Sequence, residues 1–78
     1  MSKTKTMTKL ISAKELASLT AVSYAAINNY TDMGLLDVVS RKNRVRLYDS
    51  EAARERLSAV TKLINEGYTL RVIVKLLT

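Results

Sequence analysis

Apolar residues recur with helical spacing in four separate stretches of the chain, and this pattern predicts a mainly helical fold. The stretches are Ala13 to about Leu19, Ser23 to Met33, Ser50 to about Glu66, and Leu70 to Leu77. Each has an inward stripe: Leu16, Ala17 and Leu19 in the first, Ala26, Ile27, Tyr30 and Met33 in the second, Ala53, Leu57, Val60 and Ile64 in the third, and Leu70, Ile73, Val74 and Leu77 in the fourth. The four stripes predict four helices around one core.

Capping residues place the ends of these helices. Ser12 and Glu15 form a capping box before the first helix, and Ser23, Asp49 and Thr69 are N-cap residues for the other three. Glycines end the second and third helices, at Gly34 and Gly67. The three residues between the first two helices suffice only for the turn of a helix-turn-helix.

The segment between the second and third helices is rich in β-branched residues around a polar tip. Strands are expected near 37–40 and 45–48, with a turn at Lys42-Asn43, since asparagine tolerates positive φ. Alternation sends Val45 and Leu47 to one face and Arg44, Arg46 and Tyr48 to the other. The predicted fold is therefore mainly α with a small β-hairpin: a winged helix-turn-helix with four helices, two of them short, and a two-stranded wing.

Composition narrows the class of protein. The 78 residues make one domain, and we expect residues 1–9 to be a disordered basic lead and residues 10–78 to be the domain. Thirteen basic and seven acidic residues give a formal charge of +6, which favours a polyanionic partner. The chain contains no cysteine and no histidine, which excludes disulfides and His-based sites, so no metal or cofactor is expected.

Two further expectations come from the same composition. No apolar run spans a membrane and no signal-peptide core follows the basic start, so a cytoplasmic, nucleoid-associated location is expected. The carboxylates fall mainly at helix caps and on helix surfaces, and no nucleophile has a base, so we do not expect an enzyme.

The outward face of the second helix carries the side chains that suit base recognition. Small residues allow close approach to base edges, and an asparagine amide pairs in two places with adenine. The expected base contacts are Tyr24, Ala25, Asn28 and Asn29. Arg41, Lys42 and Arg44 at the tip of the ribbon are expected on phosphates, with a solvated hairpin tip as the alternative.

The order of these elements and residues resembles the DNA-binding domain of the MerR family of bacterial transcription regulators. The matching segments are Ile11 to Ala17, Val22-Ser23, Tyr30 to Leu36, Arg46 to Asp49, Glu51, Leu57, Glu66 to Leu70, Ile73 and Leu76-Leu77. The resemblance implies that the second helix enters the major groove and that the wing follows the flanking backbone. It also implies backbone contacts by Lys14, Ser23, Tyr30, Arg46, Tyr48 and Arg54. For Tyr24, Tyr30 and Tyr48, packing in the fold stays open as the alternative.

The chain departs from the family pattern at three places. Asn28 and Asn29 stand where the family has arginine and tyrosine, and Ala21 stands where a glycine is common. The long dimerisation helix and effector domain do not follow Thr78, so we expect either a DNA-binding fragment of a longer regulator or a free-standing protein of the excisionase type. The resemblance therefore does not identify the signal that the protein senses.

The leading functional prediction is sequence-specific binding of double-stranded DNA for transcription regulation, by a recognition helix at about 23–33 and a wing at about 38–48. The alternatives are an architectural or recombination-directionality factor on direct repeats, and a protein-interaction module or antirepressor. The helix Leu70 to Leu77 is apolar over much of its circumference. It is expected either to pack against the first helix or to join copies into a homodimer or cooperative oligomer. The transcription machinery is a further expected partner, and a membrane is not.

Overall fold

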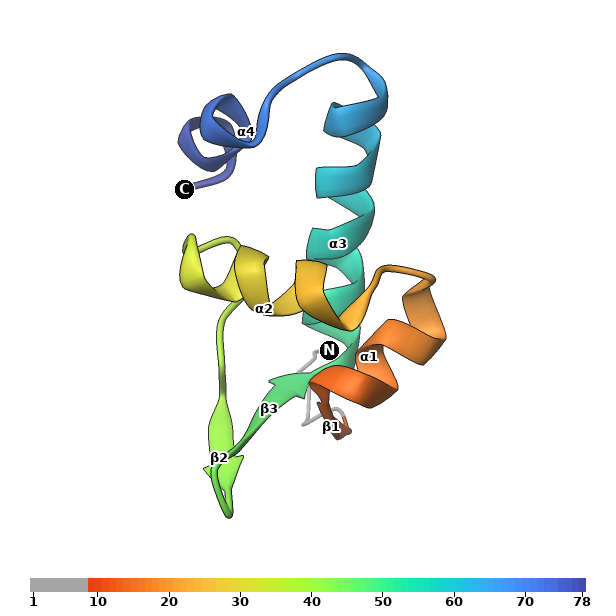
Figure 1. Ribbon diagram of the computed structural model, residues 1–78, viewed down its shortest axis with the longest axis vertical. Coiled ribbons are helices and arrows are strands. Elements are labelled where there is room, and N and C mark those ends of the chain that lie inside the picture. The colour runs from red at the N-terminus through yellow and green to blue at the C-terminus, as the bar shows by residue number, and fades with distance from the viewer. Residues whose placement is uncertain (1–8) are drawn as a thin grey trace, which may run out of the picture.

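Four helices and three short strands make up residues 9–78, the part of the chain that the computed structural model describes (Figure 1). In chain order they are β1 (Leu10–Ser12), α1 (Ala13–Thr20), α2 (Tyr24–Asp32), β2 (Ser40–Lys42), β3 (Val45–Asp49), α3 (Ser50–Asn65) and α4 (Leu70–Leu77). The four predicted helices and the antiparallel hairpin are confirmed. The predicted disordered lead, apart from Lys9, lies outside the described residues.

The predicted caps are present at every helix start. The Ser12 hydroxyl accepts from the backbone N–H of Glu15 at 3.2 Å, while the Glu15 carboxylate accepts from the N–H of Ser12 at 3.1 Å. Ser23, Asp49 and Thr69 each accept from the N–H three residues later. These bonds satisfy N–H groups that the first turn of a helix leaves without a partner.

The sheet has a third strand that the sequence pattern did not reveal. Its order is β1-β3-β2, with both pairs antiparallel, and Ile11 lies opposite Tyr48. The predicted two-stranded hairpin is present as β2 and β3, and β1 extends it to a three-stranded sheet. A strand of three residues is too short to show alternation, and its partner lies far along the chain, so only the tertiary structure defines it.

Because β3 is the central strand, Tyr48 is a core residue. Its side chain is 0% exposed and lies in the cluster that also holds Ile11, Leu16 and Ile27. Arg46 and Tyr48 lie on the same face of β3, as the alternation predicted. That face is turned toward α2, where both side chains make hydrogen bonds. Val45, on the other face, is exposed. The expectation that Tyr48 contacts the DNA backbone therefore does not hold, and its packing alternative does.

Two apolar clusters stabilise the fold. The first joins α1, α2, β3 and the start of α3, and the second consists of Leu35, Val60 and Ile73, with Tyr30 packed against both. Leu19 and Ile64, which were predicted to face inward, are exposed. For Ile64 the reason is the position of α4, because Leu63 rather than Ile64 packs into the second cluster.

Helix α4 packs against α3 and not against α1, which corrects one of the two expectations for it. Figure 1 shows α4 at the upper end of α3 and α1 near its lower end. The Arg56 guanidinium on α3 also donates to the Leu77 carbonyl at 3.0 Å. No helix within residues 9–78 has both the length and the apolar character needed to cross a bilayer.

Candidate nucleic-acid interface

Helix α2 presents its predicted base-reading residues at the surface. Tyr24, Ala25 and Asn29 are exposed and Asn28 is half-buried. Ile27, on the opposite side of the helix, is fully buried and holds α2 against the first cluster. The inward face therefore fixes the helix, and the outward face is left open to a ligand.

The turn that precedes α2 is closed by local hydrogen bonds. Thr20 donates its hydroxyl to the Leu16 carbonyl at 2.8 Å and accepts from the N–H of Val22 at 3.3 Å. Ala21 has φ of 62°, the left-handed conformation for which glycine is favoured. Ser23 accepts from the N–H of Ala26 at 3.0 Å, which leaves its own hydroxyl hydrogen free to donate. The turn thus presents one polar donor at the start of α2.

The hairpin ends in a two-residue turn that is one position later than predicted. Lys42 lies opposite Val45, and the two residues between them, Asn43 and Arg44, have φ of 51° and 70°. Positive φ at both central positions defines a type I′ turn, whose twist matches that of the strands. Arg41, Lys42 and Arg44 are all exposed, and the hairpin projects away from the helices (Figure 1). The tip therefore carries three exposed cations.

Arg46 lies between the hairpin and α2. Its Nη2 atom donates to Oδ1 of Asp32 at 3.1 Å, with the Arg46 side chain 30% exposed and the Asp32 side chain 65% exposed. The hydrogen bond to Asp32, and after it one to Tyr48, raises the pKa of Arg46 above its ordinary value, so the guanidinium stays charged throughout the working pH range. Arg46 is consequently a cation that already has an anionic partner.

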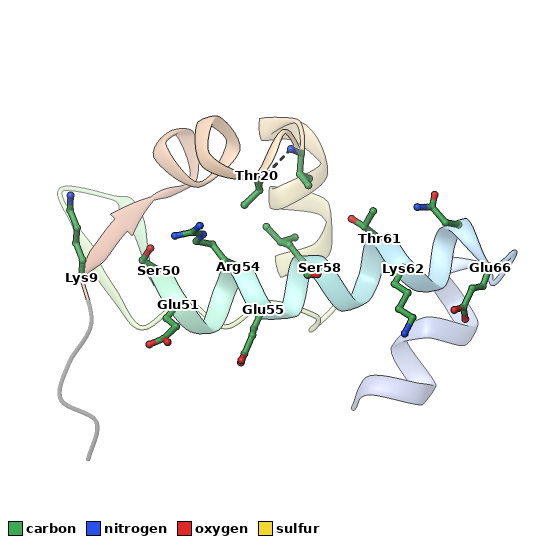
Figure 2. A pocket seen from close by; sticks show the side chains of 13 residues that line it. Lys9, Thr20, Ser50, Glu51, Arg54, Glu55, Ser58, Thr61, Lys62 and Glu66 are labelled. Carbon is green, nitrogen blue, oxygen red and sulfur yellow. Dashed lines mark hydrogen bonds between the residues drawn. The ribbon is translucent and has the colours of Figure 1, made fainter. Parts of the chain in front are cut away.

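The remaining predicted backbone contacts are spread over three elements. Lys14 is exposed in the first turn of α1, and Tyr30 is half-buried between the two clusters. Arg54 lines an open hollow of about 1150 Å³ along α3, beside the α1–α2 turn, and most of the residues around it are polar. In Figure 2, Arg54 and Lys9 extend on the side of α3 that faces Thr20, while Glu51 and Glu55 extend away from it. No hairpin residue lines this hollow, so Arg54 is separate from the cations of the tip.

Comparison with known families decides the class of protein. The family of MerR helix-turn-helix regulatory proteins matches the chain over residues 11–78. The chain belongs to the MerR family. Its function is therefore DNA binding in transcription regulation, with double-stranded DNA as the partner. No curated protein and no solved structure matched the chain.

In this MerR-family chain the structure leaves most of the predicted contact residues at least partly exposed, but it separates one pair. Arg46 and Tyr48 were both expected on DNA, yet Arg46 lies at the surface and Tyr48 lies in the core. Residues 9–78 contain no group of three or more His, Cys, Asp or Glu side chains that could hold a metal ion. The chemistry that this surface offers is that of amides, hydroxyls and cations.

Two residues of interest were missed by sequence reasoning. Asp32 is the last residue of α2, where a carboxylate meets the negative end of the helix dipole, and this unfavourable position was a signal that it has a tertiary partner. Lys9 was assigned to the lead, but its carbonyl accepts from the N–H of Ser50 at 2.9 Å and its side chain lines the hollow with Arg54. No sequence signal distinguished Lys9 from the lysines that precede it.

Proposed function

We propose that α2 is a recognition helix that binds in the major groove and that the β2–β3 hairpin is a wing that lies on the flanking DNA backbone. The observation that carries the proposal is the exposed face of α2, which presents Tyr24, Ala25, Asn28 and Asn29 on a helix whose other side is buried. An asparagine amide on this face matches the donor and acceptor pair of adenine. The three tip cations lie on the hairpin that follows α2 in the chain.

Phosphate contacts supply most of the proposed affinity. Cations that neutralise phosphates release counterions, so affinity falls as salt rises, with little regard to sequence. The proposed backbone contacts are Lys14, Ser23, Tyr30, Arg41, Lys42, Arg44, Arg46 and Arg54. Sequence preference then comes from the base contacts of α2, each worth about 1–3 kcal/mol for a good two-point contact.

The test separates these two roles. A preferred duplex is first selected from a randomised pool, and fluorescence anisotropy then measures affinity for that duplex and for random duplex over a range of salt. Asn28→Ala is expected to weaken binding to the selected duplex by about tenfold, roughly 1.4 kcal/mol, and to leave random duplex almost unchanged. Arg44→Ala is expected to weaken both and to reduce the salt slope by about 0.9.

Lys62→Ala is the matched control. It removes one exposed cation from α3, on a side chain that points away from Arg54 (Figure 2), so the salt slope should stay the same. Equal losses on selected and random duplex for Asn28→Ala would show that Asn28 does not read a base. An equal effect of Lys62→Ala and Arg44→Ala would show that only net charge matters and that the hairpin is not a wing.

We further propose that copies of the protein associate through the outer side of α4. Ile73 is buried against α3, but Val72 and Leu76 on the other side are exposed, and Tyr68 just before the helix is exposed as well. Sedimentation with and without the selected duplex should show an assembly that Leu76→Gln disrupts and the control Leu19→Gln does not. A selected site with inverted repeats would indicate a symmetric dimer, and one with direct repeats a head-to-tail array.

A further inference from the structure

We propose that α2 selects a short run of A·T base pairs, in which the Asn28 amide binds an adenine and Ala25 packs on the methyl group of a neighbouring thymine. This inference rests on the proposed function, because it needs α2 in the major groove, and it adds which base pairs the helix selects there. The observation that carries it is the chemistry of the outward face of α2, which consists of amide and apolar side chains with one phenol.

Charged side chains are the usual readers of G·C pairs. Arginine or lysine bonds guanine O6 and N7 at two points, and aspartate or glutamate accepts from cytosine N4. From Tyr24 to Thr31, α2 carries no charged side chain, and Asp32 at its C-terminal end is bonded to Arg46 at 3.1 Å. Recognition helices contact base edges with their N-terminal residues. The part of α2 that would meet the bases therefore lacks the residue types that select guanine or cytosine.

The asparagine amides are the polar groups on this face that suit adenine. Neither Asn28 nor Asn29 uses its side-chain amide in a hydrogen bond to a residue of the described part of the chain, 9–78. An amide offers an acceptor and a donor side by side, which match the N6 amino group and N7 of adenine. Guanine presents two acceptors, O6 and N7, so the amide oxygen would face a second acceptor and one of the two bonds would be lost.

Ala25 supplies an apolar contact next to Asn28. It is exposed, and its small side chain allows the helix to approach the thymine C5 methyl group, which projects into the major groove. Residues three apart on a helix have Cβ atoms about 5–6 Å apart, and successive base pairs are about 3.4 Å apart. Ala25 and Asn28 therefore meet bases that lie one or two steps apart, and together they select adjacent A·T pairs.

The first arm of the experiment compares the duplexes selected from a randomised pool by wild type and by Asn28→Ala. Wild type should enrich neighbouring A·T pairs, and Asn28→Ala should lose the preference at one of these positions while it keeps the others. A G·C pair at the position that Asn28→Ala no longer selects would overturn the inference. The proposed function would still stand in that case, because α2 would be shown to read a base.

The second arm uses base analogues in the selected duplex, with anisotropy as the readout. Adenine without its N7 acceptor, 7-deazaadenine, should lower wild-type affinity by about fivefold at the Asn28 position and should have no effect on Asn28→Ala. Uracil, which is thymine without its methyl group, should lower wild-type affinity by about three- to fourfold and should have no effect on Ala25→Gly. An analogue effect of equal size in wild type and in the matching variant would mean that another residue reads that group.

Ala52→Gly is the matched control for Ala25→Gly. It also places a glycine at an exposed position in a helix, but in α3, so it should keep the full loss of affinity on uracil. Loss of the uracil effect in both variants would mean that helix stability, and not the Ala25 methyl group, is responsible. Thermal unfolding of each variant checks that the fold is retained.

Inosine·cytosine pairs separate the two grooves. Inosine is guanine without its 2-amino group, so this pair matches G·C in the major groove and A·T in the minor groove. Replacing the A·T pair read by Asn28 with inosine·cytosine should weaken wild-type binding by at least about fivefold, as a G·C pair should. Retained affinity would mean that the A·T preference comes from the minor groove or from duplex shape, and the inference would be wrong. Wild type that binds no duplex in a salt-dependent way would instead refute the proposed function itself.

Discussion

The Tyr48 hydroxyl donates a hydrogen bond to the Thr31 hydroxyl oxygen across 2.8 Å, and this bond joins the central strand to the candidate recognition helix. The direction follows from a proton count. Thr31 donates its single hydroxyl hydrogen to the Ile27 carbonyl at 2.8 Å, so it can only accept from Tyr48. One of the contacts between β3 and α2 is therefore a hydrogen bond whose tyrosine is entirely buried.

Tyr48→Phe tests that bond with little change in volume. Removing the hydroxyl leaves Thr31 with its bond to Ile27 but also removes the acceptor for the Arg46 guanidinium, so the loss is about 1–2 kcal/mol of the free energy of unfolding. For a domain of this size each kcal/mol corresponds to a fall in Tm of roughly 4–8 °C, measurable by circular dichroism. Tyr24→Phe is the control, because the Tyr24 side chain is exposed, and an equal fall in both variants would contradict the assignment.

The turn between α1 and α2 carries a strain that one substitution relieves. Ala21 has φ of 62°, and a left-handed conformation costs an ordinary residue roughly 1–2 kcal/mol. Ala21→Gly removes that cost but adds about 0.4–1 kcal/mol of backbone entropy to the unfolded chain, so a net stabilisation of about 0.5–1 kcal/mol is expected in urea unfolding. Ala52→Gly, at an exposed position in the first turn of α3, should instead destabilise the fold. Two changes of the same sign would show that the turn is not strained.

Substitutions of Arg44 at the hairpin tip can change the stability of the fold and the affinity for DNA independently. Arg44 has φ of 70° in the type I′ turn, so Arg44→Gly should stabilise the fold by about 0.5–1 kcal/mol while it removes a phosphate contact. Arg44→Ala removes the same contact without relieving the backbone. Both variants should lose affinity for random duplex to the same extent, and only the glycine variant should unfold at higher temperature. Unequal affinities would mean that the shape of the tip contributes to binding as well as its charge.

The helices were predictable because their determinants are local. Ser12 and Glu15, Asp49 and Thr69 lie within a turn of the N–H groups that they cap, and Gly34 and Gly67 adopt the positive φ that ends a helix. The family match over residues 11–78 then confirms the class that those residues resembled. Short-range chemistry and the order of the elements were enough for this part of the structure.

What could not be predicted depends on contacts between distant segments. Strand β1 exists because Ile11 pairs with Tyr48, and that pairing is also what makes β3 central and buries Tyr48. The partner of Arg46 is Asp32, on another element, and alternation along β3 cannot say which of its faces packs on α2. The sequence therefore predicted that most residues of the candidate site lie at the surface, and it did not predict the contacts that hold them.

Arg56 gives a last prediction, because it joins the two C-terminal helices. Its guanidinium, on the half-buried side of α3, donates to the Leu77 carbonyl at 3.0 Å, and so supplies a partner to one of the carbonyls that end α4. Arg56→Met keeps much of the side-chain volume but loses the donor, and should reduce stability by about 1–2 kcal/mol. Hydrogen exchange should quicken most at the amides of α4, with smaller changes in α1 and α2, since α4 packs only through the second cluster among the described residues. Arg54→Met replaces an exposed arginine two residues earlier and should leave hydrogen exchange in α4 unchanged. Uniform quickening over the whole domain in Arg56→Met would show that the bond supports the fold as a whole and not the docking of α4.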